Sequence, residues 1–268
     1  MTTARSPAVA GQFYPAEPLQ LAQDVQRLLA EARSHDLVAK ALIVPHAGYI
    51  YSGAIAATAY ASLAPIATRI RRVVLLGPTH RVAVRGLALP GVEAFDTPLG
   101  RVLLDTEVAQ SIAHLPQIVV SKQAHELEHS LEVQLPFLQS VLHDFTLLPL
   151  AVGMATPEEV AEVLEAVWGG DETLIVISSD LSHFLPYAVA QRVDNATAQS
   201  ILKLHQLLTH EQACGGTPIN GLIIAARQHH LTPHLLDLRN SGDTAGTRDR
   251  VVGYGAFAFS GEQDHAQP

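Results

Sequence analysis

One strand–helix–strand unit decides the fold of this chain: ALIVPHAGYIYSGAIAATAYASLAPIATRIRRVVLLGPTH, residues 41–80. It begins with the apolar run ALIV, which Pro45 ends, and it closes with a second run, RVVLL, which Gly77 and Pro78 end. Between the two runs lies the small-residue segment SGAIAATAYASL, which is typical of a tightly packed helix. This order of strand, helix and strand predicts parallel strands in an α/β fold.

Further elements are expected on both sides of this unit. Helices are predicted over residues 18–33, 106–114, 130–142, 157–168, 187–208 and 218–228, and strands over residues 145–150, 174–177 and 250–259. Short alternating pieces between residues 85 and 104 indicate a hairpin. No tandem repeat or low-complexity tract divides the chain, so residues 1–268 are expected to form one domain. Its centre should be a mixed or mostly parallel sheet flanked by helices.

Composition and charge exclude several classes of protein. The chain has 268 residues, of which 48% are hydrophobic, and this is enough to bury one large core. Its net charge of −9 would repel phosphate, so neither nucleic acid nor an anionic membrane is an expected partner. The sequence contains no run of 18 apolar residues, so a membrane span is not expected. The first 15 residues are broken by glycine and proline and lack the continuous apolar stretch of a signal peptide. Cys214 is the sole cysteine, which excludes an intrachain disulfide and favours a cytoplasmic location.

Three of the apolar runs end in residues that can carry chemistry. The first runs into His46, the second into His80, and the run LIVI at residues 174–177 runs into Asp180 and His183. In open α/β sheets the ligand crevice lies beyond the carboxyl ends of the strands. Parallel strands should therefore gather these four side chains at one edge of the sheet.

The residue types at this edge indicate a site for one transition metal ion. Two neutral imidazoles suit iron, copper or zinc, and a third, anionic ligand is normally needed. Asp180 could supply it, and so could Cys214, which precedes an expected helix start that would favour the thiolate. Alternatively, Cys214 is simply a small buried apolar residue. Tyr51 follows His46 in a glycine-bounded loop and could line a ligand pocket.

A competing motif is HELEH, which runs from His125 to His129. It matches H-E-x-x-H, in which two histidines one helical turn apart bind zinc and the glutamate activates water in a peptidase. That interpretation leaves the strand-end histidines unexplained. The plainer alternative is a polar helix start with a stray histidine at His125.

Several sequence blocks together resemble one known family. They are AGQFYP (10–15), VPHAGYIYSGAIAATAY (44–60), LLGPTH (75–80), EHSLEVQLPFL (128–138), ISSDLSHF (177–184), CGGTPI (214–219), and SGD followed by VVGYGAFAF (241–259). In this order they resemble the Memo family, which is distantly similar to the class III extradiol ring-cleaving dioxygenases. The resemblance spans about residues 7–259 and implies an α/β fold with a metal site at one end of the sheet.

The resemblance also implies roles for individual residues. It places His46, His80 and Cys214 at the family's metal-binding positions. Asp180 and His183 match pocket residues, and His183 takes the place of the acid/base histidine of the related dioxygenases. His129 is expected to face the pocket with Tyr51, as residues that bind the substrate. The family pattern requires no histidine at position 125, so HELEH then looks accidental.

The function that follows is a mononuclear non-haem redox protein with one iron or copper ion, zinc being possible. Cys214 stands where the extradiol enzymes use a carboxylate, and a thiolate changes the redox potential of the metal. The alternative is a binding or scaffold protein whose pocket holds a small-molecule or peptide ligand without turnover. Bacterial and archaeal members resemble component B of the AmmeMemoRadiSam system, which implies a radical SAM protein and an AMMECR-type protein as partners.

Overall fold

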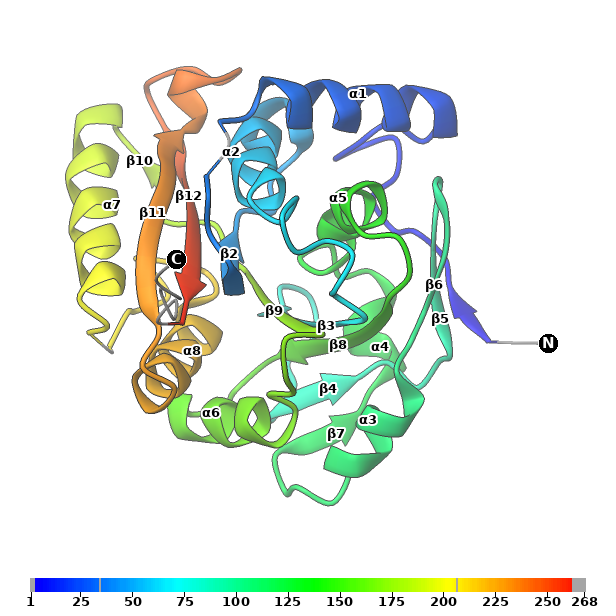
Figure 1. Ribbon diagram of the computed structural model, residues 1–268. Coiled ribbons are helices and arrows are strands. Elements are labelled where there is room, and N and C mark those ends of the chain that lie inside the picture. Colours follow the sequence, from blue (N-terminus) through cyan, green and yellow to red (C-terminus); the bar gives the residue numbers. More distant parts are fainter. Residues whose placement is uncertain (1–2, 34, 206, 262–268) are drawn as a thin grey trace, which may run out of the picture.

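Parallel strands form the centre of the structure, a computed structural model that describes residues 3–33, 35–205 and 207–261 (Figure 1). Four of them lie side by side in the order β2 (Ala39–Val44), β9 (Thr173–Ser178), β3 (Arg72–Pro78) and β8 (Thr146–Val152). All neighbours in this group are parallel. Their carboxyl ends therefore share one edge of the sheet, as the strand–helix–strand unit predicts.

Antiparallel strands extend this centre on both sides. On one side β12 (Val251–Ser260) pairs with β2, and β11 (Thr232–Asn240) and β10 (His183–Leu185) both pair with β12. On the other side β4 (Leu87–Leu89) is antiparallel to β8, and β7 (Ile118–Val120) is parallel to β4. The result is a nine-stranded mixed sheet, which confirms the predicted α/β class.

A separate three-stranded sheet holds the N-terminal segment. It consists of β1 (Ala4–Arg5), β5 (Ala94–Thr97) and β6 (Gly100–Leu103), with β1 parallel to β5. Strands β5 and β6 form the hairpin expected between residues 85 and 104. The first part of that stretch, β4, joins the large sheet instead.

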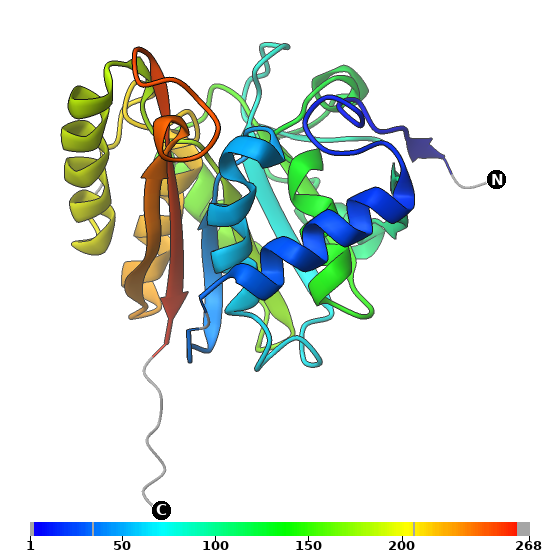
Figure 2. The ribbon, with the colours of Figure 1, turned by 90° about the horizontal axis from the view of Figure 1, so that it is seen from above.

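Helices cover both faces of the large sheet (Figure 1), and Figure 2 looks onto one of the two helical layers. One layer holds α1 (Pro18–Glu31), α2 (Tyr49–Ala61) and α5 (Leu135–Val141), and the other holds α6 (Pro157–Ala166), α7 (Tyr187–Leu202) and α8 (Gly216–Gln228). Two short helices, α3 (Thr106–Ile112) and α4 (Lys122–Glu126), flank the β7 end. Along β9, Val176 packs into the first layer and Ile177 into the second. Burial on both faces explains why the central strands are continuously apolar.

Local sequence explains where some helices begin and how closely they pack. Helix α6 starts at Pro157, and Thr156 and Glu159 cap it reciprocally. On α2, a Cβ atom added to Gly53 would lie 3.0 Å from Leu28 of α1, so the small residues allow the two helices to approach closely. No helix in the described ranges is long and apolar enough to cross a membrane.

Helix α7 is shorter than the predicted helix over residues 187–208. It ends at Leu202, and both Leu204 and Leu207 have positive φ angles, 53° and 93°, which break the helix. The side chain of Asn220 on α8 accepts the backbone N–H groups of Leu207 and Leu208 instead. Gln206, which the prediction included, lies outside the described residues. The predicted helix over residues 130–142 begins with a 3-10 turn at Glu132–Gln134 before α5.

Candidate metal centre

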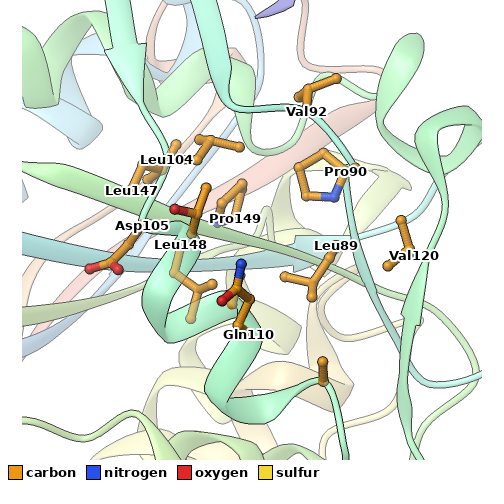
Figure 3. A pocket seen from close by; sticks show the side chains of 14 residues that line it. Leu89, Pro90, Val92, Leu104, Asp105, Gln110, Val120, Leu147, Leu148 and Pro149 are labelled. Atoms are coloured by element: carbon orange, nitrogen blue, oxygen red, sulfur yellow. The ribbon is translucent and has the colours of Figure 1, made fainter. Parts of the chain in front are cut away.

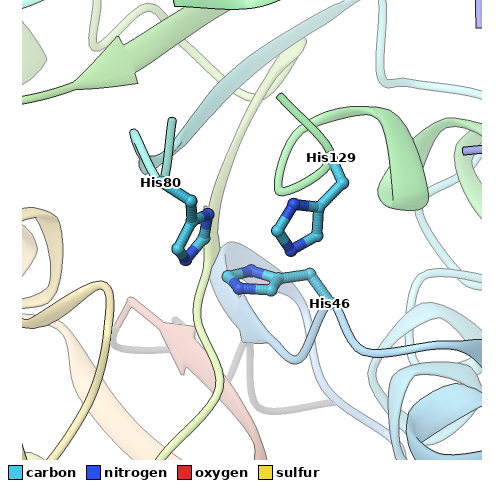
Figure 4. A group of neighbouring side chains, drawn as sticks. All are labelled: His46, His80 and His129. Atoms are coloured by element: carbon cyan, nitrogen blue, oxygen red, sulfur yellow. The ribbon is translucent and has the colours of Figure 1, made fainter. Parts of the chain in front are cut away.

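Three histidines meet at the carboxyl edge of the parallel strands (Figure 4). His46 follows β2, His80 follows β3, and His129 lies between α4 and the 3-10 turn. Their ligand atoms all lie within 4.8 Å of one another, and their ring centroids are 4.6 to 5.3 Å apart. These three side chains form a group that could hold a metal ion.

The hydrogen bond at Nδ1 of His46 determines which of its ring nitrogens keeps a lone pair for a ligand bond. Its Nδ1 lies 2.9 Å from Oγ of Ser178, and that hydroxyl donates its own proton to the carbonyl of Ser130 at 2.6 Å. Nδ1 must therefore carry the proton and donate it to Ser178, so Nε2 keeps its lone pair. Complete burial, followed by the neighbouring imidazoles, lowers the pKa of His46 well below its usual value, which keeps the ring neutral.

His80 and His129 share one carboxylate, that of Glu128. Its Oε1 lies 2.9 Å from Nδ1 of His80 and 3.3 Å from Nδ1 of His129. Burial alone would raise the pKa of Glu128, but the hydrogen bonds and charge of His80, with further backbone donors, lower it to about 2. Burial lowers the pKa of His129 to about 4. The ionised carboxylate therefore orients the imidazole of His80 through Nδ1, an arrangement common behind metal ligands, and lies next to Nδ1 of His129.

The sulfur of Cys214 lies beside the imidazole group, directly before α8. Its Sγ is 3.4 Å from Nε2 of His46. This contact is a hydrogen bond, and its length is close to the roughly 3.5 Å between a sulfur and a nitrogen ligand in a tetrahedral zinc site. The sulfur is not, however, one of the ligand atoms that lie within 4.8 Å of one another; that group holds the three imidazoles alone. The loop is fixed by Ser179, whose Oγ accepts the N–H of Gly215 at 2.9 Å.

The expectation that the helix start would favour the Cys214 thiolate is wrong for the protein without a cation. Burial, together with the nearby Asp180 carboxyl, raises the pKa of the thiol to about 12. The desolvation of the thiolate outweighs the influence of the helix terminus. A metal ion would have to displace the thiol proton as it binds.

Asp180 and His183 lie close to this group but have different surroundings. The buried Asp180 accepts the backbone N–H of His46 at 2.8 Å, and burial raises the pKa of its carboxyl to about 7. His183 starts β10 and is partly buried, which lowers its pKa. Tyr51, on the first turn of α2, has no described hydrogen bond from its hydroxyl to the imidazoles. It lies near the buried Tyr254, whose pKa is raised by burial, by Asp180 and by Tyr51.

The peptidase interpretation of HELEH is wrong. Helix α4 ends at Glu126, so His125 and His129 do not share a helical face. The ring of His125 is buried, and its Nε2 donates a hydrogen bond to the carbonyl oxygen of Ala88 at 2.7 Å. This nitrogen is therefore not available to a zinc ion. Of the two histidines, His129 alone joins the imidazole group.

Sequence reasoning missed the contacts that hold the His129 loop in place. The fully buried Glu132 accepts hydrogen bonds from Arg5, Tyr14 and the backbone N–H groups of Ala8 and Val9. Arg5 also donates to the carbonyl of Glu128 at 2.6 Å. A charged residue inside the apolar run LEVQLPFL was the available signal, because a buried carboxylate needs partners.

A second pocket lies away from this centre (Figure 3). It has a volume of about 220 Å³ and lies among α3, β4 and β8. Its lining is mainly apolar, and it shares no residue with the imidazole group. The carboxylate of Asp105 at its edge pairs with Arg72 at 2.8 Å, which leaves this pocket without a free charged group of its own to bind a ligand.

An α/β fold that gathers three imidazoles at the carboxyl edge of its parallel strands, two of them from strand ends and one from the loop after α4, defines a protein with a candidate site for a single metal ion. Comparison with known families identifies the lineage: the family model described as "Memo-like protein" matches residues 5–258. The chain belongs to this Memo-like family, which confirms the resemblance drawn from the sequence blocks.

Relatives match the chain over nearly its full length. A MEMO1 family protein of Sulfolobus acidocaldarius is 33% identical, covering 95% of this chain and 99% of its own. A MEMO1 family protein of Aquifex aeolicus is 35% identical, covering 95% and 98%. Among solved structures, the uncharacterized protein JW3007 of Escherichia coli K12 matches with a TM-score of 0.49 and 13% identity, covering 80% of this chain and 98% of that one.

Proposed function

We propose that this chain is a mononuclear non-haem metal protein with oxidoreductase activity. His46, His80 and Cys214 would hold an iron or copper ion, with His129 as a further donor. One observation carries the proposal: three imidazoles converge within 4.8 Å, and a sulfur lies 3.4 Å from Nε2 of His46. Nitrogen and sulfur donors suit iron, copper and zinc.

The residues fit such an ion in their protonation and in their support. Ser178 and Glu128 hydrogen-bond the Nδ1 atoms of His46 and His80, so Nε2 of these two rings can act as a ligand. A bound iron or copper ion supplies electron transfer or the activation of dioxygen. The imidazoles contribute no charge, and the sulfur would supply the anionic donor after losing its proton.

The remaining residues of this edge would position groups and move protons. Asp180 fixes the His46 loop through the backbone N–H that it accepts at 2.8 Å. His183, partly buried on the same edge, would accept or donate a proton at its ring nitrogen when a substrate is bound.

The test is the metal content of protein purified without oxygen. Elemental analysis of the wild type should find about one iron or copper ion per chain, and His80→Ala and Cys214→Ala should each lose most of it. His143→Ala changes an exposed histidine outside the group and should keep the wild-type content. Unchanged metal content in both site variants would overturn the ligand assignment.

Turnover is tested separately from binding. Oxygen uptake and hydrogen peroxide formation are measured with the iron- or copper-loaded protein and a panel of catechols. Metal-dependent uptake that His183→Ala reduces supports the redox function, whereas a flat response favours a binding protein. The cytoplasmic location, and the radical SAM and AMMECR-type partners, remain predictions of the sequence.

A further inference from the structure

A cleft of about 440 Å³ opens directly beside the candidate metal centre. His80 and Cys214 form part of its wall, so a molecule in the cleft would reach the proposed ligands. The rest of the wall comes from the ends of β3 and β8, from the loop after His80, and from His210 and Thr217 around the start of α8. This volume lies within the range of small-molecule sites.

The lining of the cleft carries no permanent charge. Aspartate, glutamate, lysine and arginine are all absent from it, and the polar side chains are those of Thr79, Thr217, His80, His210 and Cys214. A charged ligand that loses water in such a place finds no opposite charge, which costs binding energy. The cleft of the metal-free protein should therefore favour an uncharged molecule.

Backbone hydrogen bonds hold one wall of the cleft in shape. The N–H of Thr79 donates to the carbonyl of Val152 at 3.0 Å, and the N–H of Met154 donates to the carbonyl of Val84 at 2.7 Å. A Cβ atom added to Gly153 would lie 2.1 Å from the oxygen of Val84, so only glycine permits this approach. The same wall places the side chain of Met154, 71% exposed, at the cleft.

His210 presents a hydrogen-bond acceptor to this cleft. Its Nδ1 lies 3.3 Å from the carbonyl oxygen of Cys214. A carbonyl oxygen can only accept, so Nδ1 carries the proton, and in the neutral ring Nε2 keeps a lone pair. The other polar side chains of the lining are two threonine hydroxyls and the proposed metal ligands His80 and Cys214. Nε2 of His210 is therefore the ring acceptor that a metal ion would leave available.

We propose that this cleft binds the substrate of the metal centre. The substrate class is a small uncharged molecule that carries an O–H or N–H donor, and Nε2 of His210 accepts that donor. That the bound molecule is a substrate rests on the proposed function, whereas the cleft and its selectivity do not depend on a metal ion. His210 is thereby a binding residue that positions the molecule beside His80 and Cys214.

The selectivity is tested with four probes of similar size on the metal-free full chain. Benzamide is neutral and has N–H donors, N,N-dimethylbenzamide lacks them, benzoate is an anion and benzylamine is a cation at neutral pH. NMR titration should show benzamide shifting the backbone amides of Val84, Gly153 and Thr217, with the other three binding about tenfold more weakly. Equal binding of the ions, shifts elsewhere, or no binding of benzamide would overturn the proposal.

Two variants test the cleft and His210 individually. His210→Phe keeps a ring but removes this acceptor, so benzamide should bind more weakly than it does to the wild type, with Nε2 of His80 left as the second ring acceptor of the metal-free cleft. Ala83→Trp places a large side chain in the cleft and should block all four probes. His205→Phe, an exposed histidine of the same loop that does not line the cleft, should bind benzamide like the wild type. Unchanged benzamide affinity in both cleft variants would refute the assignment.

Metal binding and benzamide binding are measured separately, so the cleft and the metal site can each fail without the other. Metal content is measured on the wild type and on the His80 and Cys214 variants, without any probe. Metal bound as predicted but no benzamide in the cleft would overturn the cleft alone. Selective benzamide binding in a chain that takes up no metal would overturn the metal assignment and leave the cleft as a ligand site.

Discussion

Both carboxylate oxygens of Glu128 accept hydrogen bonds from His80. Oε2 accepts the backbone N–H at 2.6 Å, and Oε1 accepts Nδ1–H at 2.9 Å. The ring and the backbone of one residue are thus fixed by a single side chain, which is itself only 3% exposed. Any ion on Nε2 of His80 would depend on this carboxylate for the direction of the ring.

We therefore expect Glu128→Gln to weaken metal binding although no ligand is removed. A glutamine cannot accept from all the donors that the carboxylate accepts, and affinity should fall about 10- to 100-fold. Competition with a metal-binding dye measures the affinity. Glu126→Gln, on the exposed end of α4, is the matched control and should bind like the wild type. Wild-type affinity in Glu128→Gln would show that the ring direction does not depend on the carboxylate.

The ion pair between Arg5 and Glu132 joins the N-terminal segment to the His129 loop. The two charged atoms are 2.7 Å apart, and both side chains are almost completely buried. We expect Arg5→Met to lower the free energy of unfolding by about 3–5 kcal/mol, because it leaves a buried carboxylate without its partner. Urea denaturation provides the measurement.

Arg27→Met is the control for this ion pair. Arg27 pairs with Asp24 and Glu31 on the surface of α1, and all three side chains are well exposed. Such pairs contribute about 1 kcal/mol or less, so this variant should unfold close to the wild type. Similar losses for the two arginine variants would mean that the buried pair has no special structural role.

The parallel strands and the residues at their ends could be predicted from the sequence, and so could part of the site. His46, His80 and Asp180 each follow an apolar run, and parallel strands necessarily bring such positions to one edge. The sign of the Cys214 pKa shift could not be predicted, since it depends on burial rather than on the nearby helix start. A local pattern carries no information on how deeply a loop is buried.

Contacts between distant segments explain the rest of what was missed. Arg5 and Glu132 are 127 positions apart, and Asn220 of α8 accepts the backbone N–H groups of Leu207 and Leu208 in the loop before His210. HELEH shows the converse failure, because a five-residue pattern suggested a helix that ends at Glu126. In both cases tertiary contacts decide the outcome, and a single sequence does not display them.

Stability should fall in mild acid because of His125. Burial lowers the pKa of this histidine to about 4 from 6.5, so the unfolded chain takes up a proton at a pH where the folded chain does not. The neutral, buried His125 therefore contributes roughly 3 kcal/mol to the free energy of unfolding. This contribution is complete above pH 6.5 and is lost as the pH falls toward 4. Unfolding free energies of wild type and His125→Phe are compared between pH 7 and pH 4.5.

The comparison removes the other titrating groups, which both proteins share. His125→Phe loses the hydrogen bond to Ala88 and should be less stable at pH 7. Toward pH 4.5 the wild type should lose stability faster, so the two curves should converge. Parallel curves over this range would show that His125 is protonated equally well in the folded and unfolded chains.

The part of Cys214 in the metal site can be separated from that of His129. In the copper(II)-loaded protein a bound thiolate should give an intense visible charge-transfer band. Cys214→Ser should remove this band, whereas His129→Ala should weaken binding but keep the band, because the sulfur beside His46 remains. His114→Ala, an exposed histidine outside the group, should match the wild type. A band that survives Cys214→Ser would show that the sulfur is not a ligand, and the three imidazoles would then have to hold the ion alone.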